Sequence, residues 1–284
     1  MFMTSQSLKM INITRFAPSP TGYMHLGHAY SALFASANGD RFLVRMEDID
    51  STRCRPEYEH AILNDLAWIG LNWESPVRRQ SEHLADYTSA LSILQDQNLV
   101  YPCFCTRKDI QREISSSSHA PHGPEGSIYP GLCRNMDPIE QAENIAAGIP
   151  HALRLKTDIA AMQVGPLTWY DAEAGEVPAC PNIFGDIVLA RKDAPTSYHL
   201  AVTVDDHLQG ISLVTRGSDL FTASHLHRLL QALLSFDPPT YHHHRLVTDQ
   251  DGNRFAKRNK SFTLKSLRLK GYTPSQVRAL AGWN

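Results

Sequence analysis

The sequence predicts an α/β protein whose doubly wound parallel sheet is interrupted by an inserted subdomain. Three observations support this prediction. Residues 12–46 have the pattern of a strand, a turn, a helix and a second strand, which is the unit from which parallel sheets are built. The strand-like apolar pattern stops near residue 101 and returns near residue 182. Finally, 284 residues suffice for one large domain with an insertion.

The first strand is expected at residues 12–16. It ends in residues 17–22, where two prolines and a glycine allow neither a strand nor a helix to continue. Residues 28–37 are rich in small side chains and predict a helix, and residues 41–46 predict the second strand. Apolar residues then recur at helical spacing in two further segments, residues 56–68 and 81–97.

The character of the chain changes after residue 100. A run of four serines at residues 115–118 and a loop rich in proline and glycine are typical of an irregular inserted subdomain. Apolar runs after residue 182 predict strands, and the remaining segments predict helices. These expected strands are residues 187–190, 200–204 and 211–214, and the expected helices are residues 224–235 and 264–284.

We therefore expect four parts. They are the first half of the catalytic-type domain (1–100), the inserted subdomain (101–181), the second half of the domain (182–245), and a basic loop with short C-terminal helices (246–284).

The composition excludes several classes of protein. The 27 Lys and Arg residues are balanced by 29 Asp and Glu residues, so the surface as a whole is not that of a general nucleic-acid binder. No run of about 18 apolar residues predicts a membrane span, and residues 1–9 lack the apolar core of a signal peptide. Five cysteines, an odd number, do not suggest a disulfide framework. We expect a cytoplasmic protein without a membrane partner.

The sequence His25-Leu26-Gly27-His28 lies where the first loop turns into the first helix. A helix N-terminus offers unpaired N–H groups and partial positive charge, which suits a triphosphate. Two imidazoles three residues apart can reach the same phosphate, and Gly27 lets the backbone approach a nucleotide closely. Taken alone, two histidines near a helix start are equally compatible with capping and surface roles.

The segments around this motif match those of a known family. Residues 15–28 have the sequence RFAPSPTGYMHLGH, and residues 45–50 have the sequence RMEDID. Together they resemble the glutamyl-specific branch of the class I aminoacyl-tRNA synthetases. The resemblance continues through residues 198–207 and 214–220. It implies a Rossmann-like fold and an enzyme that activates an amino acid with ATP, at a site formed by a HIGH-type and a KMSKS-type sequence.

The resemblance also implies a glutamate pocket. Arg15 and Arg216 would hold substrate carboxylate, since a guanidinium fork binds a carboxylate bidentately and discriminates against an amide. Glu47 would hold the α-ammonium group, and Tyr198 would form a hydrogen-bonding wall. Taken singly, each of these residues is equally compatible with a surface ion pair or a core position. The substrate residues that the family match implies are Arg15, Ala17, Ser19, Glu47, Tyr198 and Arg216.

The second ATP element is expected near the C-terminus. Residues 254–258, RFAKR, match the position of the KMSKS-type loop, with Ala256 where serine is usual and Lys257 retained. Lys260-Ser261 is a shifted alternative, and a solvated basic loop is a third. The implied ATP site, which takes ATP with Mg²⁺, contains Pro18, His25, Gly27, His28 and Lys257. Of these, His25, His28 and Lys257 would stabilise charge on the triphosphate and are the implied catalytic residues.

Only residues 262–284 follow Ser261, so we expect no anticodon-binding domain in this chain. This feature resembles a truncated branch of the family. That branch activates glutamate without tRNA and then esterifies queuosine in the anticodon loop of tRNA(Asp). We expect a monomer. A short synthetase that charges tRNA(Glu), an inactive paralogue that serves as a binding module, and an unrelated nucleotidyltransferase remain as alternatives.

The inserted subdomain contains Cys103 and Cys105, and later Tyr129 and Cys133. Thiolates are good Zn²⁺ ligands, but a tetrahedral structural site needs four donors. The pattern resembles the zinc knuckle of the truncated branch, in which a tyrosine supplies the fourth ligand, and so implies one Zn²⁺ per chain. His119 and His122 are competing donors, and three inert reduced cysteines are the alternative.

Two further features carry no predicted site. Consecutive strand residues point to opposite faces, so the three histidines at residues 242–244 are not expected to converge on one metal ion, and we interpret them as an edge strand. Cys54 and Cys180 have no partner suggested by the sequence, and we expect both thiols to be buried.

Overall fold

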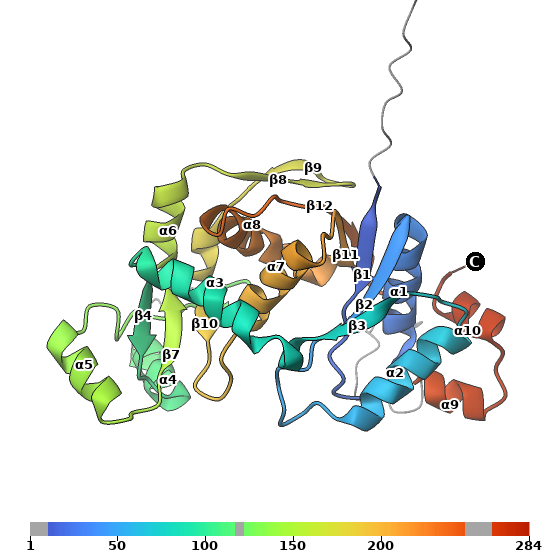
Figure 1. The fold of residues 1–284 in the computed structure, drawn as a ribbon, viewed down its shortest axis with the longest axis horizontal. Coiled ribbons are helices and arrows are strands. Elements are labelled where there is room, and N and C mark those ends of the chain that lie inside the picture. The colour runs from blue at the N-terminus through green and yellow to red at the C-terminus, as the bar shows by residue number, and fades with distance from the viewer. Residues whose placement is uncertain (1–10, 117–121, 248–262, 284) are drawn as a thin grey trace, which may run out of the picture.

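The computed structural model describes residues 11–116, 122–247 and 263–283, and Figure 1 shows their arrangement. The core is a parallel sheet that begins with β1 (Ile13–Phe16), β2 (Arg41–Met46) and β3 (Glu74–Arg79), in the order β1-β2-β3. The parallel register pairs Ile13 with Arg41 and Phe16 with Val44. This arrangement confirms the predicted parallel α/β unit.

The second half of the sheet lies on the other side of β1. Ile13 donates its backbone N–H to Ser212 Oγ at 2.9 Å, and the Ser212 amide donates to the Ile13 carbonyl at 3.1 Å. These bonds place β1 beside β11 (Leu213–Gly217), which pairs in parallel with β12 (Thr240–His244). β12 in turn pairs with β8 (Thr168–Asp171), and β8 forms a hairpin with β9 (Gly175–Pro178).

Helices cover the sheet in two groups (Figure 1). The first group packs around β1 and β2 in one hydrophobic cluster, and the second packs in another cluster that includes Leu200, Leu226 and Leu230. The first group is α1 (Leu26–Asn38), α2 (Pro56–Trp68), α9 (Leu264–Leu269) and α10 (Pro274–Leu280). The second group is α3 (Leu84–Asp96), α7 (Tyr198–Leu208) and α8 (Ala223–Leu233). Short 3-10 turns are η1 (Gln80–Glu82), η2 (Pro181–Phe184) and η3 (Ser218–Leu220).

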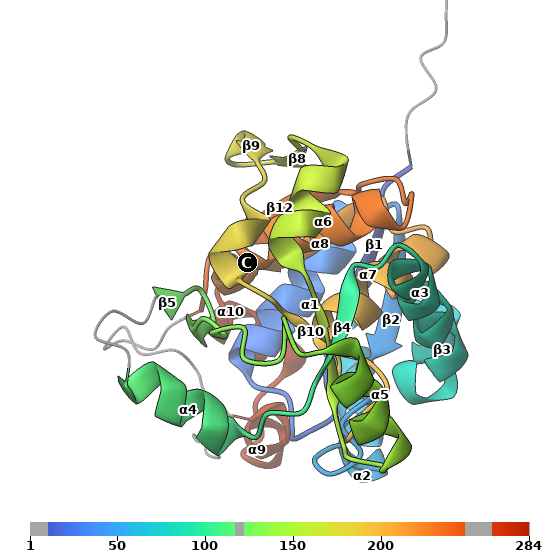
Figure 2. The same ribbon diagram turned by 90° about the vertical axis from the view of Figure 1, so that its left-hand side faces the viewer.

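The inserted part of the chain lies at one end of the molecule, the end that faces the viewer in Figure 2. Its small antiparallel sheet has the order β10-β7-β4. The strands are β4 (Val100–Cys103), β7 (Ala152–Leu155) and β10 (Val188–Ala190), with the short hairpin β5 (His122–Gly123) and β6 (Gly126–Ser127). The helices are α4 (Arg107–Ser116), α5 (Pro138–Ala146) and α6 (Thr157–Val164).

One predicted strand is wrong. Residues 200–204 were expected to be extended, but they lie within α7, whose first turn is capped by the Ser197 side chain. Every residue from His199 to Asp206 is buried, so the helix has no solvent-exposed face in this stretch. In residues 200–204, LAVTV, the apolar side chains are not spaced with the 3.6-residue period, and the β-branched residues then resemble a strand.

Three smaller expectations need correction. β12 is not an edge strand, because it lies between β11 and β8. Cys180 is exposed and Cys54 is half-buried, so neither is the buried thiol that was expected.

Within the described ranges, no helix has the length and apolar character needed to cross a bilayer.

Candidate active site

A cavity of about 690 Å³ lies at the carboxyl ends of β1, β2, β11 and β12. Polar groups that follow parallel strands meet at this edge of a doubly wound sheet, which is where such folds bind ligands. The residues that line it are Arg15, Phe16, Ala17, Pro18, Ser19, His25, Gly27, His28, Ser31, Glu47, Tyr198, Thr215, Arg216, Gly217, Asp219, Leu220, His244, Leu246 and Val247. Every substrate and ATP residue expected from the sequence is among them except Lys257, which lies outside the described residues.

The two histidines of the first motif form the start of α1. His25 is the N-cap, and its Nδ1 accepts the Gly27 N–H at 3.1 Å, while the His25 N–H donates to His28 Nδ1 at 3.3 Å. The rings stack with their centroids 3.7 Å apart. Since both Nδ1 atoms accept, the proton of each neutral imidazole is on Nε2. Each ring is thereby prepared as a donor at the N-terminus of a helix.

Gly27 packs closely against the His25 ring. A Cβ at position 27 would lie 3.1 Å from Cε1 and 3.2 Å from Nδ1 of His25, closer than ordinary contact. A larger residue would therefore have to move the first imidazole by a few tenths of an ångström.

The expected KMSKS-type loop, residues 254–258, lies outside the described residues, but its flanks do not. Val247 lines the cavity. Thr263 forms an isolated antiparallel bridge with His25, and Leu264 donates its N–H to the Met24 carbonyl at 2.8 Å. The chain before this segment therefore lies at the cavity, and the chain after it lies beside His25.

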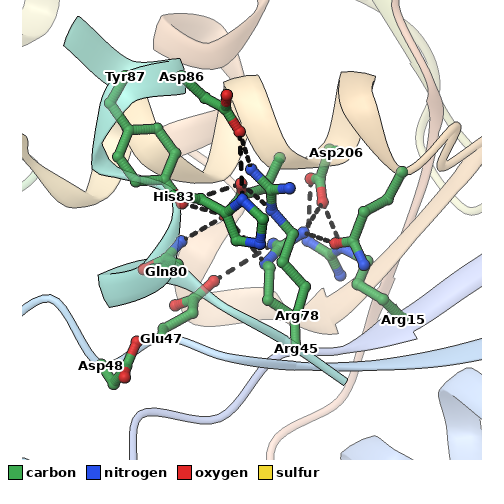
Figure 3. Close-up of polar contacts among 12 residues, drawn as sticks. Arg15, Arg45, Glu47, Asp48, Arg78, Gln80, His83, Asp86, Tyr87 and Asp206 are labelled. Atoms are coloured by element: carbon green, nitrogen blue, oxygen red, sulfur yellow. Dashed lines mark hydrogen bonds and ion pairs between the residues drawn. The ribbon is translucent and has the colours of Figure 1, made fainter. Parts of the chain in front are cut away.

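Arg15 is buried and already holds a carboxylate. Its Nε donates to Asp206 Oδ1 at 2.8 Å and its Nη2 to Asp206 Oδ2 at 3.2 Å, and Nη1 donates to the Thr215 carbonyl at 3.0 Å (Figure 3). Burial alone would raise the pKa of Asp206, but Arg15 and Arg45 outweigh it and hold the pKa below its usual value. The charge of Arg15 is therefore largely compensated by the protein.

Glu47 is joined to the same group of charges. The fully buried Arg45 donates from Nη1 to Asp206 Oδ1 at 2.8 Å, and its Nη2 lies 3.3 Å from Glu47 Oε1 (Figure 3). Burial raises the pKa of the Glu47 carboxyl, although Arg45 and Arg15 oppose the change. A substrate ammonium group would add a further favourable charge to this carboxylate.

A second buried carboxylate, that of Asp205, extends this network of ion pairs and hydrogen bonds. Asp205 accepts from Arg78 Nε at 2.7 Å, from Gln80 Nε2 at 2.8 Å and from the Tyr87 hydroxyl at 3.0 Å. Figure 3 shows Arg78, Gln80 and Tyr87 converging beside Arg45, on the side away from Arg15. Since β3, η1 and α3 supply Arg78, Gln80 and Tyr87 in turn, the network fixes these three elements against α7.

Arg216 differs from Arg15 in its partners. Its Nε donates to His243 Nε2 at 3.1 Å, its Nη1 to His227 Nδ1 at 3.1 Å, and its Nη2 to Ser224 Oγ at 2.6 Å. All three partners are uncharged acceptors, and no ion pair joins Arg216 to a carboxylate within the described ranges. The side chain is nevertheless only 6% exposed. Arg216 therefore places a buried, uncompensated positive charge on the wall of the cavity.

The remaining predicted residues complete the wall. Tyr198 is the first residue of α7 and is 38% exposed, with its ring centroid 5.8 Å from that of His227. The Ser19 and Pro18 backbone belongs to the loop after β1, and the Pro18 carbonyl accepts the Glu47 N–H at 3.0 Å. This bond ties the two loops that carry the candidate substrate residues.

The sequence matches a known protein family along almost the whole chain. A model of the family described as tRNA synthetases class I (E and Q), catalytic domain, matches residues 12–282. A glutamyl-Q tRNA(Asp) synthetase of Rhodobacter capsulatus is 44% identical over 279 residues, which cover 95% of this chain and 99% of that protein. This chain belongs to the class I tRNA synthetases, in the glutamyl-Q tRNA(Asp) synthetase family. It is therefore an ATP-dependent ligase of the aminoacyl-tRNA synthetase type.

Other relatives agree with this assignment. A glutamyl-Q tRNA(Asp) synthetase of Nocardia farcinica is 41% identical and is covered over 82% of its length. Among solved structures, the glutamate-tRNA synthetase of Elizabethkingia anophelis superposes with a TM-score of 0.74 at 26% identity. The match covers 93% of this chain and 54% of that one, so this chain spans about half the length of that synthetase.

Outside the cavity of this synthetase, the inserted part contains a compact cluster of sulfur atoms. Sγ of Cys103, Cys105 and Cys133 all lie within 4.8 Å of one another. The Tyr129 hydroxyl lies 3.3 Å from Cys103 Sγ and 3.5 Å from Cys105 Sγ. Zn–S bonds of about 2.3 Å in a tetrahedron separate the sulfurs by about 3.8 Å. The donor set and its spacing thus fit a four-coordinate ion.

Two contacts hold the Tyr129 side chain in place at this cluster. The Arg154 guanidinium lies 3.8 Å above the Tyr129 ring centroid, and the Cys133 N–H donates to the Tyr129 hydroxyl at 2.9 Å. His119, one of the competing donors, lies outside the described residues, and the side chain of His122 is likewise not described. The described residues alone bring the phenol and three thiols together.

The hydrogen-bond partners of Arg15 and Arg216 were not predicted from the sequence. Asp206 and Arg45 belong to segments used for the family match, but no role followed from their spacing. His243 was set aside with its neighbours as part of an edge strand, yet it accepts from Arg216, and His244 lines the cavity. The three consecutive histidines have different surroundings: His242 pairs with Glu173, His243 with Asp171, and His244 packs against Tyr30.

Proposed function

We propose that this synthetase activates glutamate with ATP in the absence of tRNA, and then transfers the glutamyl group to queuosine at the wobble position of tRNA(Asp). The observation that carries the proposal is the buried guanidinium of Arg216, which lacks a carboxylate partner within the described ranges and faces a cavity beside Glu47 and Tyr198. The similarity to glutamyl-Q tRNA(Asp) synthetases over nearly their full length supports the choice of acceptor.

In this proposal Arg216 receives the side-chain carboxylate of glutamate. An arginine held by neutral acceptors gains far more from a ligand carboxylate than one already paired with an aspartate, because the ligand supplies the missing charge. Glutamine would leave that charge unpaired in a buried place, so it is rejected. Glu47 receives the α-ammonium group, Tyr198 and Ser19 contribute hydroxyls, and Arg15 with Ala17 forms the floor between them.

ATP occupies the part of the cavity at the start of α1. His25 and His28 donate from Nε2 to the phosphates, Gly27 and Pro18 allow close approach of the nucleotide, and Lys257 supplies an ammonium group from the KMSKS-type loop. The nucleotide is taken as its Mg²⁺ complex, in which the ion neutralises phosphate charge. No residue of the chain forms a covalent bond to substrate, so catalysis here is positioning and charge stabilisation.

The first step joins an α-carboxylate oxygen of glutamate to the α-phosphorus of ATP and breaks the bond from that phosphorus to the bridging oxygen, releasing pyrophosphate. In the second step a hydroxyl of the queuosine cyclopentene ring attacks the carbonyl carbon of glutamyl-adenylate. Its proton is lost and AMP leaves with the former carboxylate oxygen. The product is a glutamyl ester on the anticodon loop.

We also propose that the cluster of Cys103, Cys105, Tyr129 and Cys133 binds one structural Zn²⁺. The four donors come from both ends of the segment that contains β5 and β6, so the ion would hold that segment closed. The enzyme is expected to act as a cytoplasmic monomer.

The acceptor is tested with labelled glutamate and purified tRNAs. The proposal predicts label on tRNA(Asp) that contains queuosine and none on tRNA(Asp) that contains guanosine at the same position. Label on the 3′ end of tRNA(Glu) would instead support an ordinary glutamyl-tRNA synthetase. Absence of label on every tRNA would overturn the proposed transfer.

A further inference from the structure

A continuous path of buried hydrogen bonds runs from Arg216 to the inserted part of the chain. Arg216 Nη1 lies 3.1 Å from His227 Nδ1, and His227 Nε2 lies 3.2 Å from His199 Nδ1. His199 Nε2 lies 3.0 Å from Glu125 Oε1. The two histidines are 3% and 7% exposed, whereas the Glu125 side chain is 59% exposed. The path therefore begins at the surface and ends at the cavity.

The direction of each bond follows from the chemistry of arginine. A guanidinium has only donors, so His227 Nδ1 must accept from it, and the proton of the neutral His227 is then on Nε2. That N–H donates to His199 Nδ1, which places the His199 proton on its own Nε2. This second N–H donates to the Glu125 carboxylate. All three bonds thus point from Arg216 toward Glu125, and each fixes the tautomer of the next ring.

A shorter chain of hydrogen bonds leaves the other side of Arg216. Its Nε donates to His243 Nε2 at 3.1 Å, so the proton of His243 is on Nδ1, which lies 2.7 Å from Asp171 Oδ2. Asp171 is itself held by the backbone N–H groups of Glu173 and Ala174, each at 3.0 Å. Arg216 is therefore held by two chains, one through His243 to Asp171 and one through His227 and His199 to Glu125, and neither carboxylate touches the guanidinium.

Both flanking rings remain neutral at physiological pH. Burial, together with Arg216, lowers the pKa of His227 well below its usual value. The same two causes lower the pKa of His243 to about 4, although Asp171 opposes them. Neutral rings are what the arrangement needs, because a protonated imidazole could not accept from Arg216.

We propose that Glu125, His199 and His227 are positioning residues for substrate glutamate, through which the β5–β6 hairpin of the inserted part orients Arg216. This inference rests on the proposed function, in which Arg216 receives the substrate carboxylate. Asp171 makes His243 a better acceptor directly, and Glu125 does so for His227 through His199, while neither carboxylate contacts the arginine. The charge of Arg216 stays available for a ligand while its orientation is fixed from two sides.

Glu125 occupies a distinctive place in the chain. It lies in the turn between β5 and β6, and this turn is between the Cys103–Cys105 pair and the Tyr129–Cys133 pair in sequence. His199 is the second residue of α7 and His227 lies in α8, so the path joins three elements that are far apart in sequence. A change in the hairpin would therefore reach the substrate pocket with no direct contact to substrate.

The kinetic test uses the full-length enzyme in ATP–pyrophosphate exchange, with KM for glutamate and KM for ATP measured separately. Glu125→Ala and His227→Leu are expected to raise KM for glutamate by about 10-fold, the usual effect of losing a hydrogen bond to a charged group, and to leave KM for ATP unchanged. His227→Gln keeps an acceptor and a donor and should restore most of the affinity. Glu143→Ala, which removes an exposed glutamate of α5 in the same inserted part, is the matched control.

The tautomers are tested independently of activity by nitrogen-15 NMR of the imidazoles. The inference predicts the Nε2–H form for His199 and His227 and the Nδ1–H form for His243, each resonance assigned by its loss in a variant. It also predicts that His199 keeps the Nε2–H form in Glu125→Ala, because His227 still donates to its Nδ1. Opposite tautomers, or an unchanged KM for glutamate in Glu125→Ala and His227→Leu, would overturn the inference. If the predicted tautomers are present but the unmodified enzyme shows no ATP–pyrophosphate exchange, that result would overturn only the proposed function and not the inferred path of hydrogen bonds.

Discussion

Arg15 and Asp206 form a buried two-point ion pair, in which Nε and Nη2 of the arginine donate to the two carboxylate oxygens at 2.8 and 3.2 Å. Arg216, which also lines the cavity, is held only by neutral acceptors. Two arginines that the sequence assigns to the same task thus differ in charge compensation. Arg15 is paired with a carboxylate, whereas Arg216 contacts no carboxylate within the described residues.

Replacement of Asp206 should be costly to stability. Asp206→Asn removes the charge that both Arg15 and Arg45 face, and breaking a buried pair in this way typically costs about 3–5 kcal/mol. The free energy of unfolding is measured by denaturant titration. Glu74→Gln is the matched control, since Arg41 and Glu74 form the same two-point geometry with 50% and 42% of their side chains exposed. Equal losses in the two variants would contradict this account.

Arg216→Ala should abolish activation of glutamate while ATP still binds. The variant removes the positive charge of Arg216 from the cavity wall and leaves His25, Gly27 and His28, which also line the cavity, in place. ATP affinity is measured by calorimetry and activation by pyrophosphate exchange. Arg216→Lys keeps the charge but loses the planar fork, and we expect it to retain only a small part of the activity. Full exchange activity in Arg216→Ala would show that another group holds the substrate.

Asp65 should make the protein less stable at neutral pH than at mildly acidic pH. It is 3% exposed, its Oδ2 has no hydrogen-bond partner, and burial raises its pKa to about 6 despite Arg268 and Lys265. The folded protein therefore binds a proton that the unfolded chain has released, so this contribution is present below about pH 4 and is lost as the pH rises through 6. A shift of this size corresponds to about 3 kcal/mol.

Asp65→Asn tests this contribution. The variant should be more stable than the unmodified protein at pH 7, and the difference should disappear near pH 4, as measured by urea denaturation at the two pH values. A variant that is less stable at pH 7 would show that the ionised carboxylate has a partner that stabilises it.

The cysteine cluster should hold about one zinc ion per chain. Metal analysis of the purified protein, before and after a strong chelator, measures this directly. Cys105→Ser removes one of the converging thiols and should lower the zinc content, whereas Cys180→Ser, at an exposed cysteine far from the cluster in sequence, should not. Purified protein that contains no zinc, although all four donor residues are intact, would contradict the proposed zinc site.

Much of the fold could be predicted because its signals are local. The turn at residues 17–22, the small residues of α1 and the apolar spacing of α2 and α3 are each legible within a short window, and each element forms as expected. The strand expected at residues 200–204 failed because burial of α7 on all sides erased the period that distinguishes a helix. Tertiary packing, which a short window does not contain, decided that element.

The candidate site likewise contains some residues that the sequence predicts as a pair and others whose partnership it does not predict. His25 and His28 were predicted as a pair because they share one helical turn. The partnership of Arg216 with His227 and His243 spans 11 and 27 residues, and it exists only because β11, β12 and α8 pack together. No spacing rule connects such residues. Likewise, the sequence suggests that Arg15 and Arg216 are equivalent, and only their contacts show which charge is already compensated.

The most direct test of the central claim is ATP–pyrophosphate exchange with glutamate and no tRNA, in parallel with glutamine and aspartate. We expect rapid exchange with glutamate, little with aspartate, whose side chain is one methylene shorter, and none with glutamine, which leaves Arg216 without a carboxylate partner. Exchange that requires tRNA, or exchange with glutamine at the same rate, would contradict the account.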